Sequence, residues 1–271
     1  MKKFLVSAAV ALLAVSGTAL AQTNVNVGHL APFAPDVADT AVSVDVDGMQ
    51  VLTGVTYNQF SGYLELAPAG TPPGSTLVEV RTPPGGAVAI SDTFSLAADT
   101  NYSVLAIGDG SNQPLQLLPL IDDLTPPATG NVKIRVVHAA PFAASLPDTA
   151  VSVRTQGGNV VGGLNSVEFG QDSGFLEVPA GQYDFLIATP DGSTPLIDPV
   201  PLSLPGGTIV TLYAVGDGSN QPLGITAVFG DGTATGITTR VGDARPIPTL
   251  GMIGLLALSC LVLLVGVRNL R

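Results

Sequence analysis

One octapeptide occurs twice in this 271-residue chain. Gly-Asp-Gly-Ser-Asn-Gln-Pro-Leu fills residues 108–115 and again residues 216–223, an offset of 108. Eight identical residues at one spacing indicate an internal duplication, so the chain is expected to fold as two similar units. Each octapeptide follows a run of mostly apolar residues, 101–107 and 209–215. The Asp-Gly and Ser-Asn pairs supply the chemistry of a turn after each predicted strand.

Other segments repeat at nearly the same offset. The sequence Asp-Thr-Ala-Val-Ser-Val occupies residues 39–44 and 148–153, and Ser-Gly-aromatic-Leu-Glu occupies residues 61–65 and 173–177. The offset drifts by a few residues, as expected when insertions fall in surface loops. We therefore predict a first unit over 25–120, a linker over 121–131, a second unit over 132–230 and a flexible stalk over 231–246.

Alternating apolar and polar residues predict short β-strands in both units. Residues 42–46 alternate valine with serine and aspartate, and Asp47-Gly48 predicts a hairpin turn after them. In the second unit Gly157-Gly158 stands at the corresponding turn, and residues 183–188 are expected to form a single strand. No segment of either unit has a convincing helical period. The predicted fold class is all-β, with two tandem immunoglobulin-like β-sandwich domains; a small closed barrel is the alternative.

Charge and cysteine content exclude several classes of function. All 21 acidic residues lie between Asp36 and Asp243, and the six basic residues outside the two terminal segments leave a balance of −15. Such a surface repels nucleic acid, whose binding requires clustered lysine and arginine. The single cysteine, Cys260, lies in a C-terminal apolar run, so the two units have no disulfide and no cysteine-based zinc site. We expect no cofactor and no metal.

The N-terminus has the pattern of a secretory signal peptide. Two lysines follow Met1, an apolar run covers residues 4–15, and Ala19-Leu-Ala21 fits the small-x-small rule for cleavage. The expected signal peptide is residues 1–21. An N-terminal membrane anchor is the alternative.

The C-terminus has the pattern of a single transmembrane helix. Residues 250–267 are 18 uncharged and mostly apolar residues, about the minimum that spans a bilayer. Arg268 and Arg271 follow, and positive residues stay on the cytoplasmic side, so the two units are expected outside the inner membrane. A buried core helix is the alternative.

A short motif precedes this span: Ile247, Pro248, Thr249 and Leu250, with Gly254 a little further on. Motif, apolar span and terminal arginines, in this order, resemble a bacterial sorting tail of the IPTL type, although Ile253 stands where that family commonly has tryptophan. The resemblance implies an exosortase-like membrane transpeptidase as a partner, which would cut near the motif and pass the protein outward. A plain single-span anchor is the alternative.

The two histidines, His29 and His138, occupy the same place in each repeat. Asp39 and Asp148 follow ten residues later, and a serine follows four residues after each aspartate. Catalytic triads are recognised by geometry rather than order, so a hydrolase remains an alternative, although the chain has no Gly-x-Ser-x-Gly motif. We favour a structural role, in which each histidine ends a strand and bonds across the Ala-Pro turn while the aspartate caps the loop.

The repeated octapeptides also carry oxygen atoms suited to calcium. Asp109 and Asp217 are the acidic members, and Asp45-Val-Asp47-Gly48 is a second acidic stretch. None of these matches the longer calcium loop that ends in glutamate. Turn chemistry explains the octapeptides equally well.

Four segments of the second unit carry a resemblance to a known family. They are residues 135–141, 148–153, 173–181 and 212–216. They resemble the bacterial secreted domain-of-unknown-function 4397 family, and the resemblance covers nearly all of residues 25–230. It implies an exported β-sandwich, often in tandem, and brings no established activity.

These patterns together favour an exported, surface-sorted protein without enzymatic activity. Its role would be structural or adhesive at the cell surface or in the extracellular matrix, in contact with exopolysaccharide or other surface proteins. A periplasmic, membrane-anchored binding or assembly module is the first alternative, and a secreted hydrolase that uses His29 or His138 is the second. The chain has no tryptophan and only 5% aromatic residues, which disfavours a sugar-stacking platform.

Overall fold

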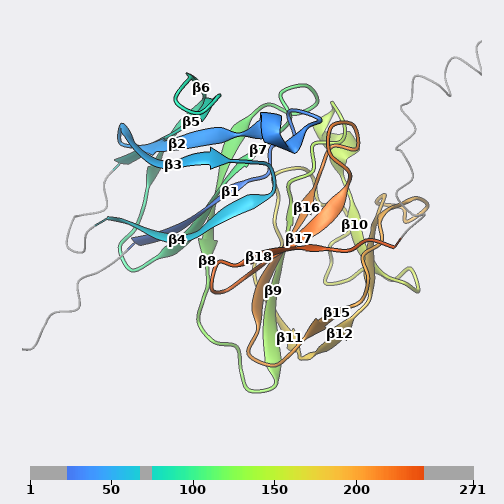
Figure 1. Ribbon diagram of the computed structural model, residues 1–271. Helices are drawn as coiled ribbons and strands as arrows, with labels where there is room; N and C mark the ends of the chain where they lie inside the picture. The colour runs from blue at the N-terminus through green and yellow to red at the C-terminus, as the bar shows by residue number, and fades with distance from the viewer. Residues whose placement is uncertain (1–22, 68–74, 241–271) are drawn as a thin grey trace, which may run out of the picture.

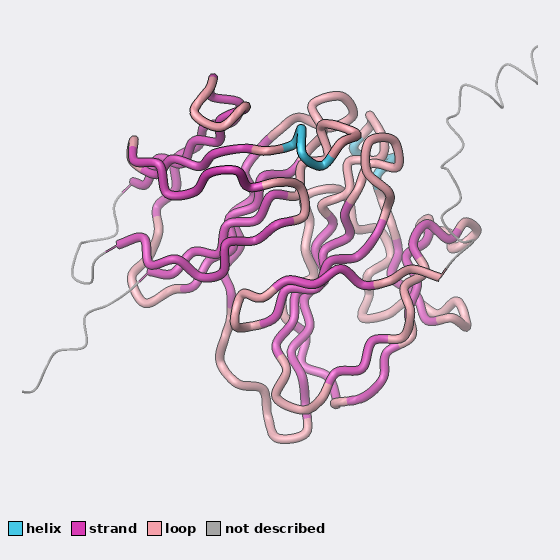
Figure 2. The backbone as a smooth tube through the Cα atoms, viewed as in Figure 1, coloured by secondary structure: helices cyan, strands magenta, loops and turns pink. Residues whose placement is uncertain are grey.

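Two all-β units follow one another along the chain. The computed structural model describes residues 23–67 and 75–240. Strands β1–β8 form the first unit and β9–β18 the second, and the units lie side by side (Figure 1). Apart from strands and loops there are only two single-turn 3-10 helices in the described part, η1 (Val37–Thr40) and η2 (Leu146–Thr149) (Figure 2). The predicted signal peptide and sorting tail lie outside the described residues. In the part that is described, no helix has the length and apolar character to cross a membrane.

The first unit consists of two four-stranded sheets. One has the order β4-β1-β7-β8, in which β1 and β7 run parallel, and the other has the antiparallel order β3-β2-β5-β6. The strands are β1 (Thr23–His29), β2 (Val42–Val46), β3 (Met49–Val55), β4 (Gln59–Ala67), β5 (Ser75–Thr82), β6 (Ala87–Ser95), β7 (Asn101–Ile107) and β8 (Gln116–Asp122).

The valine alternation explains how these two sheets pack. Val42, Val44 and Val46 of β2 are all buried and contact buried residues of the other sheet, among them Val25 and Val104. One apolar core therefore fills the space between the sheets, which is the arrangement of a β-sandwich. The predicted hairpin between β2 and β3 is confirmed, since Asp47 and Gly48 both have positive φ, 49° and 79°.

The second unit repeats the plan with shorter outer strands. Its main sheet has the order β11-β9-β16-β17-β18, again with a parallel pair, β9 and β16, at its centre. A three-stranded sheet, β10-β13-β14, and a two-stranded sheet, β12-β15, complete the unit. The strands are β9 (Asn131–His138), β10 (Ser152–Thr155), β11 (Leu176–Pro179), β12 (Gly181–Tyr183), β13 (Phe185–Ala188), β14 (Pro195–Ile197), β15 (Leu202–Leu204), β16 (Ile209–Val215), β17 (Gly224–Phe229) and β18 (Ala234–Ile237).

Two expectations need correction in the second unit. The predicted stalk over 231–246 does not begin as a flexible segment, because residues 234–237 form β18 and pair with β17 through a hairpin turn at Asp231-Gly232. The single strand expected over 183–188 is interrupted at Asp184, so that β12 pairs with β15 while β13 pairs with β10 and β14. A single strand can therefore contribute to two different sheets, which its sequence pattern does not reveal.

A third apolar cluster joins the two units. It combines Leu30, Leu105 and Ile107 of the first unit with buried residues of the second, including Tyr213 and Phe169. The ring centroids of Phe60 and Tyr213 lie 5.5 Å apart across this boundary. Because apolar contact of this kind is buried only when the units dock, they form one packed body rather than separate beads on a linker. All three clusters consist of residues within 23–240.

Candidate functional site: the interface between the two units

The repeated octapeptides form two identical loops, which we call the clasp loops (residues 108–115 and 216–223). In the first loop, Asp109 Oδ1 accepts backbone N–H groups from Ser111, Asn112 and Gln113 at 2.8–3.0 Å, and Oδ2 accepts the Asn112 side-chain amide at 2.8 Å. Asp217 makes the same four bonds in the second loop. Each carboxylate therefore holds its own loop in a fixed shape.

The first glycine of each clasp loop is required by its geometry. Gly108 has φ of +90° and Gly216 has φ of +89°, a region that residues with a Cβ rarely adopt. A Cβ on Gly108 would lie 2.0 Å from the carbonyl oxygen of Pro114, and one on Gly216 would lie 2.1 Å from that of Pro222. The close approach of backbone to backbone explains why both copies have glycine here.

Each clasp loop binds the other unit. Asn112 Nδ2 donates to the carbonyl oxygen of Pro141 at 3.0 Å, and Gln113 Nε2 donates to that of Ala143 at 2.8 Å. In the opposite direction, Asn220 Nδ2 donates to Pro32 O and Gln221 Nε2 to Ala34 O, both at 2.9 Å. The acceptor residues 32–34 and 141–143 occupy equivalent places, directly after His29 and His138. The two units are thus clasped reciprocally, as the halves of a two-fold symmetric dimer would be.

A buried ion pair crosses the same interface and breaks its symmetry. Arg135 on β9 donates to Asp122 Oδ1 at the end of β8 at 2.5 Å, and the two side chains are 3% and 1% exposed. Tyr63 and Ser103 donate to the other carboxylate oxygen at 2.8 and 2.7 Å. The guanidinium lies over the ring of Phe175, 4.5 Å from its centroid. A buried charge pair with all these partners fixes the docking geometry rather than adding much stability.

The first unit has Asn26 where the second has Arg135. Asn26 is fully buried, between Tyr63 and Ser103 on the neighbouring strands. Its side-chain oxygen and nitrogen find no hydrogen-bond partner among the described residues. The two copies have therefore diverged at this position, one carrying the ion pair and the other an uncompensated polar group.

His29 stands three residues before Pro32, the first acceptor of the second clasp loop. It ends β1, and its Nε2 is 2.8 Å from the carbonyl oxygen of Thr40, while Nδ1 accepts the backbone N–H of Ala31 at 3.4 Å. These two contacts define the tautomer that carries its proton on Nε2. The ring stacks on Phe33 at 5.7 Å. Burial lowers the pKa of His29 from 6.5 to about 4, against a smaller opposing effect of the bond to Thr40.

His138 has the same surroundings in the second unit. Its Nε2 is 2.8 Å from the carbonyl oxygen of Thr149, Nδ1 accepts from Ala140, and the ring stacks on Phe142. Burial lowers its pKa to about 4 as well. Both imidazoles are thus neutral at physiological pH and use both nitrogens to hold the loop that follows their strand.

The candidate catalytic serines and aspartates are positioned elsewhere. Ser43 accepts the backbone N–H of Gly85, and Ser152 donates to the carbonyl oxygen of Thr189. Asp39 and Asp148 lie on the exposed sides of η1 and η2, and the cap of η1 is Asp36, whose carboxylate accepts from Ala38. The structure therefore brings each histidine to a threonine carbonyl and not to a serine hydroxyl.

The carboxylates of the clasp loops are directed at N–H groups. Asp109 and Asp217 are both buried, and their oxygens accept bonds from their own loops. Within residues 23–67 and 75–240, no group of three or more histidine, cysteine or acidic side chains is close enough to hold a metal ion.

The clasp loops are recognisable in the sequence as a repeat, but the residues that they bind in the other unit were not predicted. Turn formation uses Asp109, the glycines and one bond from the Asn112 amide to Asp109, but it leaves the second hydrogen of that amide and the Gln113 amide without a role. That these two side chains are identical in both copies was the signal for a further role. Arg135 and Asp122 carried no such signal, because neither has a counterpart of the same type in the other copy.

The geometry defines a class: an all-β protein of two sandwich-like repeats that lock each other through duplicated loops. A comparison with known families also finds two matching regions in the chain. The family described as "Domain of unknown function (DUF4397)" matches residues 23–148 and again residues 142–236. These two matches span most of the chain, and the protein belongs to this family. No curated protein sequence matches the chain.

Proposed function

We propose that this protein is an exported, surface-sorted module without enzymatic activity, with a structural or adhesive role at the cell surface or in the extracellular matrix. Its two domains would be immunoglobulin-like sandwiches, carried outward by the signal peptide (1–21) and delivered by the C-terminal tail with its helix (250–267). The partners would be an exosortase-like transpeptidase during sorting, and exopolysaccharide or other surface proteins afterwards.

The observation that carries this proposal is the reciprocal clasp. A protein that resists displacement at a surface benefits from domains that do not move relative to each other, and apolar contact, four amide bonds and a buried ion pair all oppose such motion here. The two histidines support a role without catalysis, since both nitrogens of each ring are used to hold backbone.

Arg240, the last described residue, is also held in place by several contacts. Arg240 donates to the carboxylates of Asp184 and Asp198, and its backbone N–H donates to the carbonyl oxygen of Asp198 at 2.8 Å. A tail attached beyond this point would pull on the second unit through an ion-pair network rather than through a free strand end.

The test is the mass of the C-terminal peptide in each cell fraction, together with binding of residues 22–245 to host cells and their polysaccharide. A C-terminus near Thr249 outside the inner membrane, with binding to cells, supports the proposal. A C-terminus at Arg271 confined to the inner membrane refutes it in favour of the periplasmic anchored module. Hydrolysis of a glycan or ester panel that is lost when both histidines are replaced by alanine would refute it in favour of the hydrolase.

A further inference from the structure

The two copies differ most in their outer sheets. In the first unit the sheet β3-β2-β5-β6 has strands of five to nine residues. The equivalent sheet of the second unit, β10-β13-β14, has strands of three or four residues. The segment that corresponds to β3 forms only an isolated bridge, Arg154 with Val160.

The second unit protects the edge of its outer sheet. Prolines occupy positions 195, 199 and 201, and proline cannot donate to a neighbouring strand. Residues 238–239 cover the same edge, since Val200 N–H donates to Thr238 O at 2.9 Å and Pro199 bridges to Thr239. Prolines and a covering segment are two of the ways in which proteins prevent pairing at a sheet edge.

Among the described residues, both edges of the outer sheet of the first unit are unpaired. Strand β6 has nine residues without proline, lysine or arginine, and its one charged residue is Asp92. Strand β3 has no proline and no charged residue, and it exposes Met49 (73%) and Val51 (37%). No described strand pairs with the outer side of either one. Edges of this length with a single charged residue between them are templates for an added strand.

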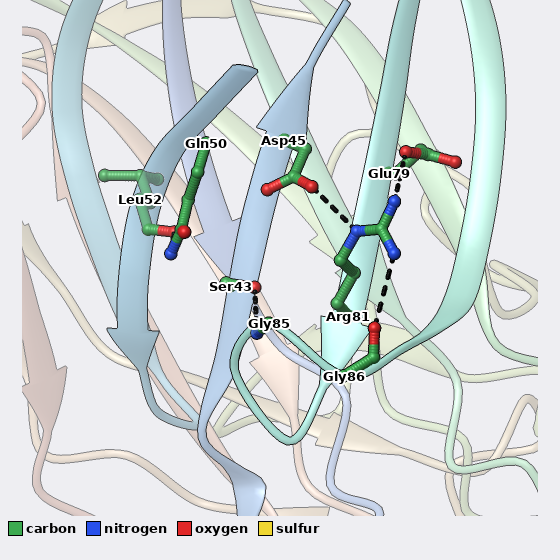
Figure 3. A network of polar contacts seen from close by, with 8 residues as sticks. All are labelled: Ser43, Asp45, Gln50, Leu52, Glu79, Arg81, Gly85 and Gly86. Atoms are coloured by element: carbon green, nitrogen blue, oxygen red, sulfur yellow. Dashed lines mark hydrogen bonds and ion pairs between the residues drawn. The ribbon is translucent and has the colours of Figure 1, made fainter. Parts of the chain in front are cut away.

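An arginine joins the two central strands of this sheet, β2 and β5, through ion pairs and a hydrogen bond. Arg81 on β5 donates to Asp45 on β2 at 2.7 Å and to Glu79 at 2.8 Å, and it also donates to the carbonyl oxygen of Gly86 in the β5–β6 turn (Figure 3). The network links β2, β5 and the turn on one face. The network therefore joins the two central strands, with β3 and β6 at the two edges of the sheet.

The directions of the strands favour one kind of partner. Because β3, β2, β5 and β6 are successively antiparallel, β3 and β6 run in opposite directions. When a second copy of the chain is placed beside the first in the same orientation, its β3 therefore runs antiparallel to β6, as a continuous sheet requires. The described residues include 20 acidic and five basic side chains, so copies repel each other elsewhere, while this seam contains a single carboxylate.

We propose that copies of this chain assemble head to tail, with β6 of one pairing with β3 of the next. Such a contact is heterologous, so it does not close on itself and produces a growing array. The inference goes beyond the proposed function and does not depend on surface sorting, because it concerns only the described residues of the first unit.

Two edge-blocked variants test the proposal. Ser91→Lys with Thr93→Lys blocks β6, and Val51→Lys with Thr53→Lys blocks β3; all four positions are exposed, and lysine is a natural edge-blocking residue. A matched control, Gln182→Lys with Ser203→Lys, places the same charges on exposed positions of β12 and β15. Residues 23–240, which contain all three apolar clusters, are followed by sedimentation velocity over increasing concentration, and far-UV circular dichroism verifies the fold.

The expected result is complementation. The unsubstituted chain and the control form larger species as the concentration rises, while each edge-blocked variant remains monomeric over the same range. An equal mixture of the two blocked variants forms dimers and nothing larger, because one intact β6 meets one intact β3. An unsubstituted chain that stays monomeric overturns the proposal. So does assembly that survives in either blocked variant, since dimers of the β3-blocked variant alone would mean that β6 pairs with β6.

Discussion

As the pH falls, the free energy of unfolding should decrease first because the two buried histidines resist protonation. The carboxylates should lower it only at more acidic pH. The pKa of each imidazole falls from 6.5 in the unfolded chain to about 4 in the folded one. Between these values the unfolded state binds more protons, so the free energy of unfolding decreases as the pH falls from about 6.5 to 4 and is fully present above about pH 7. Linkage gives a loss of about 2 kcal/mol per histidine between pH 8 and pH 5, or about 4 kcal/mol for both.

This pH window isolates the histidines from the acidic groups. The pKa values of Asp123 and Asp191 are lowered to about 2, chiefly by hydrogen bonds from Lys133 and Thr189 respectively. The stability from such carboxylates is present above their unfolded pKa of 3.8 and is lost only as the pH falls below it. Above about pH 5 their contribution is therefore nearly constant.

The assay is urea unfolding of residues 23–240, followed by far-UV circular dichroism at about pH 8 and pH 5. The reference is the double variant His29→Gln with His138→Gln, because glutamine can still donate to the threonine carbonyl but does not titrate. We expect this variant to be less stable at pH 8 and to lose little on going to pH 5. A wild-type loss below about 1 kcal/mol, or an equal loss in the variant, would refute the assignment of both rings as buried and neutral.

Three further perturbations address the interface and its loops. Arg135→Met should lower the free energy of unfolding by about 3–5 kcal/mol in urea, because Asp122 is left buried and unpaired, and adding Asp122→Asn should restore much of it. Gly108→Ala should cost at least about 2 kcal/mol more than Gly130→Ala in the same measurement, since both glycines have positive φ but only Gly108 approaches another backbone atom. Asn26→Leu should raise the urea midpoint by the equivalent of about 1–3 kcal/mol, as it removes a buried polar group without a partner.

The sequence allowed the repeat, the strands and the all-β class to be predicted, because these depend on local patterns. Valine alternation over residues 42–46 located a core strand, and Asp47-Gly48 located its hairpin. The extra strand β18 was missed because its short Ala-Thr-Gly-Ile sequence follows several glycines and threonines that also suit a flexible segment. Only its pairing with β17 distinguishes the two possibilities.

The docking of the two units could not be predicted from local patterns. Gln221 lies 187 residues from Ala34, whose carbonyl oxygen it binds, and a duplicated loop can bind its own unit, the neighbouring unit or another molecule. Backbone carbonyl acceptors leave no trace in the residue types at 32–34. The position of each histidine at the end of a strand was anticipated, but its bond to a threonine eleven residues away depends on the path of the loop between them.

The reciprocal clasp has a consequence for how chains of this family can lengthen. Each clasp loop needs the acceptor segment of a partner repeat, and each repeat offers one loop and one acceptor segment to the same partner. In a pair, both loops and both acceptor segments therefore have partners. A third repeat would leave one loop, one acceptor segment and one apolar face uncovered. We expect proteins that use this clasp to contain an even number of repeats, since each repeat then has one partner that covers its loop, its acceptor segment and its apolar face.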